Sequence, residues 1–160
     1  VEGRSGSNRV VCDLGPYGAE AQRDALDALV AAVDWLCMNE TEALRVTGET
    51  DVRTAMDALV DSYPAVGIIV RVGASGTLLS MPGRSTVRVP ALVIDDVVDT
   101  NGAGDTHSGT FCAGLVRNLD PVSAVWLANC AAGLSVREFG SATAPPMELS
   151  GRYAMPALAD

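Results

Sequence analysis

Residues Asp99–Asp105 read DTNGAGD, and this stretch decides which fold the sequence predicts. It follows the segment Val93–Val98, which we expect to be a strand, and precedes a helix that carries Phe111 and Leu115. Small side chains at such a junction leave the first backbone N–H groups of the helix uncovered, and the helix dipole adds positive potential. We therefore expect this junction to bind an anion without the help of a lysine side chain.

Asp105 places a carboxylate at the same helix start. A carboxylate and a bound phosphate repel each other, so their proximity needs a chemical reason. Phosphoryl transfer supplies one, because the carboxylate accepts the proton of an attacking hydroxyl while the amides absorb charge on the transferred group. An ordinary glycine-rich turn with Asp105 as a first-turn acid is the other interpretation, and this segment alone does not separate the two.

Outward from this segment, strands and helices alternate along the chain. Alternation of this kind predicts an α/β fold with a mostly parallel sheet covered on both faces by helices, in three layers. No repeat, low-complexity segment or linker interrupts it, so we expect one domain over residues 1–160. The expected strands are 9–13, 35–38, 66–72, 77–80 and 87–89, and the expected helices are 19–33, 40–48, 52–63 and 120–137.

Asn39 and Glu42 form a second candidate site. They are three residues apart at the start of a helix, so they share a face, and they follow a strand. Ligands of open α/β sheets gather at the carboxyl ends of strands, and an oxygen pair there suits Mg²⁺ held largely through water with nucleotide phosphates. The same two residues can also form the hydrogen-bonded cap of a helix start, which is the simpler interpretation of the pair alone.

The third candidate is the turn Gly73-Ala74-Ser75-Gly76, which follows a strand rich in β-branched residues. A G-x-x-G turn lets the backbone approach a phosphate or a ribose. Turns of this kind are common, so this one indicates a function only in combination with the other two segments.

Together the three segments resemble the ribokinase-like PfkB family of carbohydrate and nucleoside kinases. DTNGAGD resembles the family signature, Asn39-Glu40-Thr41-Glu42 the N-x-x-E motif, and Gly73–Gly76 the G-x-x-G turn, all in the family's order. The resemblance covers essentially the whole chain but only the C-terminal half of the family's usual length. We therefore expect the N-terminal half, with its sugar-binding residues and β-sheet lid, to be absent from this sequence.

The resemblance implies a catalytic role for the signature segment. Asp105 would be the catalytic base that deprotonates the acceptor hydroxyl. The anion hole would be formed by Asn101, Gly102, Ala103 and Gly104.

The resemblance also implies where the nucleotide and the cations would bind. Gly73 and Gly76 would border the nucleotide, Asn129 would lie near the adenine, and the loop around Phe139, Gly140 and Ser141 would help to close the pocket. Asn39 and Glu42 would organise Mg²⁺ through water, and Asp99 and Asn101 would lie beside a monovalent cation, K⁺.

His107 is the only histidine, and it stands where the family usually carries Phe. It lies two positions beyond Asp105, roughly 200° round the helix, so both side chains cannot easily face one substrate. We expect a surface or packing histidine here, and this geometry disfavours a hydrolase that would use His107.

Composition narrows the function class further. The chain carries 20 acidic against 11 basic residues, a formal charge of −9, which argues against a nucleic-acid surface. Its apolar runs are too short to span a bilayer. The four cysteines, Cys12, Cys37, Cys112 and Cys130, contain no C-x-x-C pair, so we expect buried thiols in a reducing cytoplasm and no zinc site.

The function that these observations predict is ATP-dependent transfer of a γ-phosphate to a hydroxyl of a small-molecule sugar, as in ribokinase or fructokinase. The alternatives are a nucleoside or vitamin-like alcohol kinase of the same family, and a non-catalytic nucleotide-binding fragment. Relatives that dimerise often do so through the lid, so a homodimer is expected where the N-terminal half is present.

Overall fold

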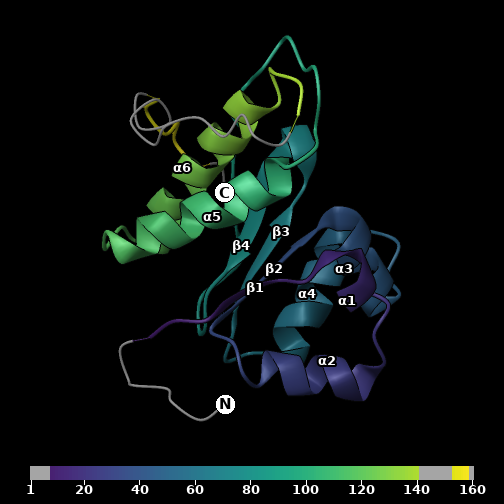
Figure 1. The fold of residues 1–160 in the computed structure, drawn as a ribbon. Coiled ribbons are helices and arrows are strands. Elements are labelled where there is room, and N and C mark those ends of the chain that lie inside the picture. Colours follow the sequence, from purple (N-terminus) through teal and green to yellow (C-terminus); the bar gives the residue numbers. More distant parts are fainter. Residues whose placement is uncertain (1–7, 141–152, 159–160) are drawn as a thin grey trace. The chain divides into compact units, whose positions relative to one another are not determined.

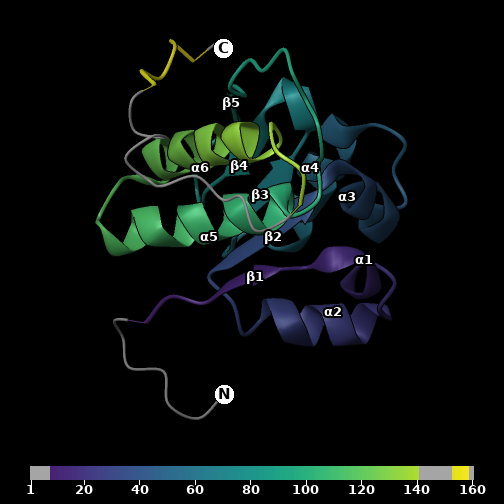
Figure 2. The same ribbon diagram turned by 45° about the horizontal axis from the view of Figure 1, so that its top comes forward.

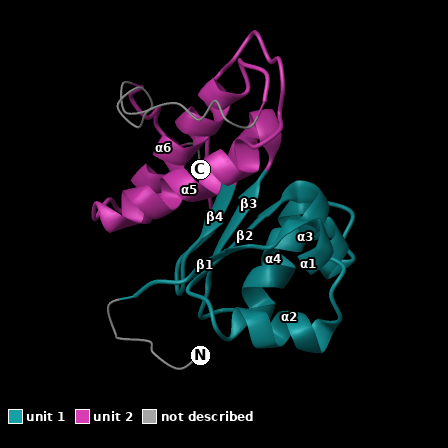
Figure 3. Ribbon diagram, in the orientation of Figure 1, with its two compact units in different colours: residues 1–71, 78–86 teal, residues 72–77, 87–160 magenta. Residues whose placement is uncertain are grey.

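The computed structural model describes residues 8–140 and 153–158 (Figure 1). The chain forms two compact units that are interleaved in the sequence (Figure 3). Unit 1 comprises residues 1–71 and 78–86, and unit 2 comprises residues 72–77 and 87–160. The expectation of a single domain stays a prediction.

Unit 1 is built on parallel strands. Its strands follow the order β1-β2-β3-β4, with β1, β2 and β3 parallel, Cys12 opposite Leu36 and Leu36 opposite Ile68. The first four residues of β2 and of β3 are buried, as expected for strands covered on both faces. The elements are β1 (Val11–Asp13), α1 (Gly15–Gly18), α2 (Arg23–Val30), β2 (Trp35–Asn39), α3 (Glu40–Thr47), α4 (Val52–Ser62), β3 (Gly67–Arg71) and most of β4 (Thr77–Ser80).

The helices of unit 1 begin and end where local sequence signals predict. Asn39 caps the start of α3, and Gly48 ends it with a φ of 76°, a left-handed conformation that glycine adopts without strain. Asp51 caps α4 by accepting hydrogen bonds from the N–H groups of Arg53 and Thr54. The expected helix over 19–33 is shorter, because the backbone of Gln22 is extended and the turn α1 precedes it.

Unit 2 contains two long helices that lie side by side (Figure 2). They approach closely at Gly114, where an added Cβ would lie 2.9 Å from the Cβ of Ala124. Asp120 caps α6, and Pro121 is its first residue. The elements are the 3₁₀ turn η1 (Gly73–Ser75), the first residue of β4, β5 (Val87–Val89), α5 (Ala103–Val116) and α6 (Pro121–Ser135).

The predicted strand over Val93–Val98 is wrong. Residues 90–100 contain no helix or strand, and Val93 is 85% exposed. The N–H groups of Val98 and Asp99 donate to the carbonyl oxygen of Val136, at 2.7 and 3.2 Å, so this segment binds the end of α6 instead of a neighbouring strand. A valine-rich segment without a pairing strand therefore remains irregular.

Two further expectations depend on which residues are described. No helix in the described part of the chain is long and apolar enough to cross a membrane. Ser141, expected in the loop that helps to close the nucleotide pocket, lies outside the described residues.

Candidate functional site

The DTNGAGD segment begins helix α5. Gly102 precedes the helix with a φ of 78°, and no side chain caps it, whereas α3, α4 and α6 each begin with a side-chain cap. The N–H groups of Asn101 and Ala103 donate to Asp99 and Thr100 at 3.0 and 3.3 Å. Among the described residues, none accepts from the N–H groups of Gly102 or Gly104. These two amides are therefore the part of the predicted anion hole that can receive an acceptor.

Asp99 holds this loop in place. Its Oδ1 accepts from the N–H of Asn101, and its Oδ2 accepts from the N–H of Gly140, both at 3.0 Å. These bonds, first that from Asn101 and then that from Gly140, lower the pKa of the Asp99 carboxyl. Gly140 has a φ of 96°, which favours glycine. The structure thus brings together two segments that the sequence analysis assigned to one site.

Asp105 and His107 lie on different faces of α5. Asp105 is exposed in the first turn, whereas His107 is only 2% exposed. Of the two expectations for His107, a surface or a packing histidine, the structure shows a buried one. Asp105 is accessible to a ligand, and its role as a base stays a prediction.

The Gly73–Gly76 turn is held by its own backbone and by the strand β5. The N–H of Val72 donates to Gly76 O at 2.7 Å, and Arg88 Nη1 donates to Ser75 O at 2.9 Å. A Cβ on Gly76 would overlap the carbonyl oxygen of Val89, and Gly76 has a φ of 88°. Only glycine allows this close approach of Gly76 to the backbone of Val89.

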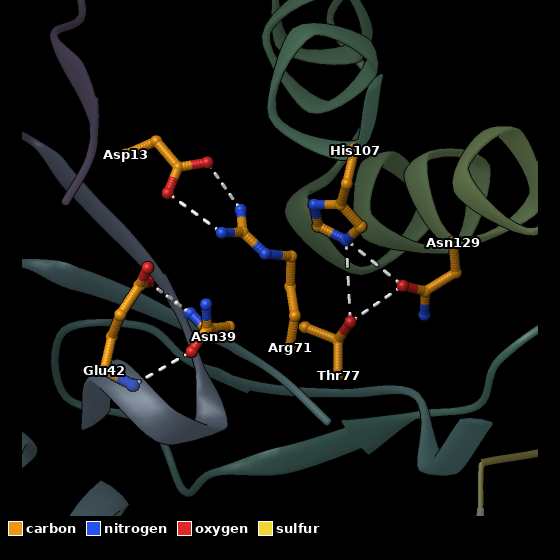
Figure 4. Close-up of polar contacts among 7 residues, drawn as sticks. All are labelled: Asp13, Asn39, Glu42, Arg71, Thr77, His107 and Asn129. Atoms are coloured by element: carbon orange, nitrogen blue, oxygen red, sulfur yellow. Dashed lines mark hydrogen bonds and ion pairs between the residues drawn. The ribbon is translucent and has the colours of Figure 1, made fainter. Parts of the chain in front are cut away.

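Asn129 is buried inside unit 2, and its side chain is fully engaged. Its amide nitrogen donates to Val89 O and Pro90 O. Its oxygen accepts from Thr77 Oγ1 (Figure 4). A hydrogen bond from this amide to a base would have to replace one of these bonds. The predicted proximity of Asn129 to adenine stays a prediction.

Asn39 and Glu42 form a capping box in unit 1 (Figure 4). Asn39 Oδ1 accepts from the N–H of Glu42 at 2.9 Å, and Glu42 Oε2 accepts from the N–H of Asn39 at 2.8 Å. The pair therefore forms the hydrogen-bonded helix cap, the simpler of its two interpretations. It does not exhaust the carboxylate of Glu42, which has a second oxygen, so the magnesium role stays a prediction.

Sequence analysis missed an ion pair at the strand ends of unit 1. Arg71 ends β3 and reaches past β2 to Asp13 at the end of β1, with Nη–Oδ distances of 2.6 and 2.9 Å (Figure 4). Burial opposes the charged guanidinium, but hydrogen bonding and attraction to Asp13, together with attraction to Glu42, outweigh it and raise the pKa of Arg71. Opposite charges at the ends of two strands were the available signal, but the strand order was needed to use it.

Metal-binding groups are sparse. Across residues 8–140 and 153–158, no group of three His, Cys, Asp or Glu side chains could hold a metal ion. Cys37 and Cys130 are buried as expected, whereas Cys12 and Cys112 are partly exposed. Burial raises the pKa of the Cys130 thiol to about 12, which keeps it protonated. Because the described residues contain no cluster of metal-binding side chains, a magnesium ion would need oxygens from a bound phosphate in addition to Glu42.

A cavity of about 490 Å³ lies elsewhere in unit 1 and contains none of the predicted site residues. Its lining includes the end of α4 and the segment after β4, among them Tyr63, Met81 and Arg84.

Comparison with known proteins decides the family. Residues 4–148 match the model described as pfkB family carbohydrate kinase. The chain belongs to this family. The resemblance drawn from the three motifs is thereby confirmed.

The relatives of this PfkB chain include kinases of known structure. It is 39% identical over 114 residues to the bifunctional protein HldE of Caulobacter sp. (strain K31), covering 69% of this chain and 23% of that protein. The structure of Arabidopsis thaliana ribokinase complexed with ribose and ATP matches with a TM-score of 0.70 and 28% identity, over 78% of this chain and 41% of that one. A putative ribokinase from Agrobacterium tumefaciens matches with a TM-score of 0.78 and 27% identity, over 89% and 45%.

These matches confirm the ribokinase-like α/β fold with a mostly parallel sheet. They also show that the chain spans about a quarter of the length of this HldE relative and less than half of these two ribokinase structures.

Proposed function

We propose that this chain is the nucleotide-binding and catalytic half of a kinase that transfers the γ-phosphate of ATP to a hydroxyl of a sugar. The observation that carries the proposal is the start of α5, where no side chain caps the helix and Asp105 is exposed in the first turn. An uncapped helix start provides N–H donors for a phosphoryl group, and an adjacent carboxylate provides a proton acceptor.

In the proposed reaction, Asp105 takes the proton from the acceptor hydroxyl as its oxygen attacks the γ-phosphorus of ATP. The bond from that phosphorus to the β–γ bridging oxygen breaks, and ADP leaves. The N–H groups of Gly102 and Gly104 stabilise the charge on the transferred group. Asp99 keeps this loop in position through its bonds to Asn101 and Gly140.

Two cations belong to the proposal. Glu42, oriented by its capping bond to Asn39, would hold Mg²⁺ through water, and Asp99 with Asn101 would lie beside K⁺. Mg²⁺ supplies positive charge that neutralises the phosphates as the group is transferred. The chain's own contribution is a carboxylate whose orientation is set by backbone hydrogen bonds before any ligand binds.

The backbone of Gly73 and Gly76 would border the nucleotide, with Asn129 and Gly140 further along the same pocket. ATP is the proposed donor because the Arabidopsis ribokinase was solved with ATP. A cytoplasmic location is part of the proposal, since ATP is produced there. So is a homodimer, formed through the N-terminal half.

A phosphotransfer assay tests the proposal. The protein is incubated with Mg-ATP and, in separate samples, with ribose, fructose, other sugars, nucleosides and vitamin-like alcohols, and new phosphate esters are detected by ³¹P NMR. A sugar phosphate that forms together with ADP supports the proposal. Esters formed only from nucleosides or alcohols would support the alternative kinase. The absence of any ester, despite ATP binding, would indicate a non-catalytic nucleotide-binding fragment.

A further inference from the structure

Unit 2 contains a buried hydrogen-bonded cluster that joins three elements: Thr77 on β4, His107 on α5 and Asn129 on α6 (Figure 4). Their exposed fractions are 1%, 2% and 7%. Asn129 Oδ1 lies 2.7 Å from Thr77 Oγ1 and 3.1 Å from His107 Nε2.

The orientation of the Asn129 amide follows from its other partners. Its nitrogen lies 3.2 Å from Val89 O and 2.8 Å from Pro90 O, two carbonyl oxygens that accept both amide hydrogens. The amide oxygen must therefore face Thr77 and His107, where it acts only as an acceptor.

The hydrogens of the two partners can then be assigned. Thr77 has one hydroxyl hydrogen, and the 2.7 Å contact gives it to Asn129 Oδ1. His107 can bond to the same oxygen only if Nε2 carries a hydrogen. Thr77 Oγ1, at 3.5 Å from Nε2, can accept a share of that hydrogen. We therefore assign a hydrogen to Nε2 of His107.

The cluster joins elements that carry two parts of the proposed site, the glycine turn and the helix of Asp105. Thr77 directly follows Gly76, the last residue of the glycine turn. Gly76 packs against the backbone of Val89 and its successors, the same segment that Asn129 holds. His107 is two residues from Asp105 on the same helix. One buried amide is thus bonded to the glycine-turn strand, to the segment against which that turn packs, and to the helix of the proposed base.

We propose that Thr77, His107 and Asn129 are positioning residues for the kinase reaction. Their hydrogen bonds set the position of the Gly73–Gly76 turn relative to the helix start that carries Asp105. A Phe at position 107 would fill a similar volume, but apolar contacts tolerate sliding, whereas hydrogen bonds are directional. This inference rests on the proposed function, because the positioned groups are those assigned to the nucleotide and the base.

The test compares Mg-ATP affinity, by titration calorimetry, between variants of similar shape. Thr77→Val removes the hydroxyl and should weaken binding about five- to tenfold, the equivalent of one lost hydrogen bond. Thr77→Ser keeps the hydroxyl and should bind within about twofold of the parent. Thr110→Val, on α5 and outside the cluster, is the matched control and should leave the affinity unchanged.

His107 gives a second, independent pair. His107→Gln retains an N–H donor and should rescue most of the affinity, whereas His107→Phe removes the donor and should lose about as much as Thr77→Val. Thermal unfolding of each variant accompanies the titration. If Thr77→Val fails to fold, the His107 pair still decides the question, because rescue by Gln but not by Phe requires the hydrogen bond.

Because His107 is the only histidine, ¹⁵N-histidine NMR reports on the cluster without ambiguity. Two results would support the assignment: a hydrogen bound to Nε2 in the parent protein, and faster exchange of that hydrogen with water in Thr77→Val. A ring with no hydrogen on Nε2 would overturn it.

The possible failures are distinguishable. A parent protein that binds Mg-ATP with the same affinity as Thr77→Val and His107→Phe overturns the positioning role and leaves the proposed function standing. A folded parent that binds no Mg-ATP overturns the proposed function, and the positioning role with it.

Discussion

The Asp13–Arg71 pair of unit 1 and the Thr77–His107–Asn129 cluster of unit 2 both join residues that are distant in the sequence, but they do so by different forces. Arg71 and Asp13 are opposite charges with side chains 15% and 27% exposed. The cluster contains no carboxylate or guanidinium and is at most 7% exposed. Attraction between charges changes gradually with distance, whereas a buried hydrogen bond is lost after a small displacement.

This difference indicates different tasks. A partly exposed charge pair beside Glu42 can rearrange when a charged ligand arrives, because water and ions compensate for small movements. A buried polar cluster loses its hydrogen bonds and leaves unsatisfied groups if it moves, so it maintains one geometry. We therefore expect the effect of substitutions in the Asp13–Arg71 pair to depend on charge and salt. The effect of substitutions in the cluster should depend on side-chain shape and hydrogen bonding.

The largest expected effect appears when Asp105, the exposed proposed base, is compared with Asp13, the carboxylate of the ion pair. Asp105→Asn should lower turnover by about 10²- to 10⁴-fold with Mg-ATP affinity and stability nearly unchanged, because an exposed general base is lost. Asp13→Asn should reduce stability and affect turnover far less. Steady-state kinetics of a kinase that contains this chain, with thermal unfolding of both variants, makes the comparison. Near-normal turnover of Asp105→Asn would remove it from the base role.

The next effect concerns the charge pair itself. Arg71→Met should lower the free energy of unfolding by about 1–3 kcal/mol, because the Asp13 carboxylate loses its charged partner. The pKa of Arg71 is raised, so the contribution of its charge is complete below the ordinary pKa of a guanidinium and is lost as pH rises through the folded-state value.

The salt dependence of the Arg71→Met effect gives a stricter test. Urea unfolding in low salt and in 1 M NaCl should show a smaller Arg71→Met effect in high salt, where the Debye length falls to about 3 Å. Thr77→Val should lower the free energy of unfolding by the same amount in low salt and in 1 M NaCl. Equal salt dependence of the two variants would contradict the distinction between the regions.

Glu42→Gln separates the two interpretations of the capping box. Glutamine can keep the hydrogen bond to the N–H of Asn39, so the fold should be retained, but the negative charge is lost. We expect the Mg²⁺ concentration needed for half-maximal activity to rise about tenfold or more. Glu42→Ala is the control that removes both functions, and an unchanged Mg²⁺ requirement in Glu42→Gln would leave the residue with a structural role only.

The smallest effect is a matched pair of helix caps. Asp51→Ala at α4 and Asp120→Ala at α6 should each lower the free energy of unfolding by about 1 kcal/mol. The side chain and then the N–H of Ser123 lower the pKa of Asp120, so its contribution is complete above about pH 3.9 and is lost as pH falls through the folded-state value.

Asp120→Asn should keep the cap and remove this acid dependence. Urea unfolding at pH 7 and at pH 3 measures both, and an acid response of Asp120→Asn equal to that of the parent would contradict the assignment.

Most of the fold could be predicted because its signals are local. Apolar periodicity and caps placed α3, α4 and α6 within two residues, and short buried runs placed β2 and β3. The segment Val93–Val98 failed because strand formation also requires a pairing partner, which no local pattern reveals.

The residues of the candidate site likewise fall into two groups, those in contiguous motifs and those joined by contacts between distant segments. The Asp99–Asp105 loop and the Asn39–Glu42 pair are contiguous motifs, so their residues could be named in advance. Arg71 and Asp13 are 58 positions apart, and Thr77 and Asn129 are 52 apart, so their contacts depend on strand order and helix packing. The polar role of His107 was likewise hidden, because its partners come from two other elements.

The most direct test of the account is a calorimetric titration of this 160-residue chain with Mg-ATP, with circular dichroism recorded on the same sample. The account predicts a folded α/β spectrum and saturable one-to-one binding, with a Kd between about 1 μM and 1 mM, as is common for enzyme substrates. A folded chain that releases no heat of binding with Mg-ATP, in a titration that detects millimolar affinity, would contradict it.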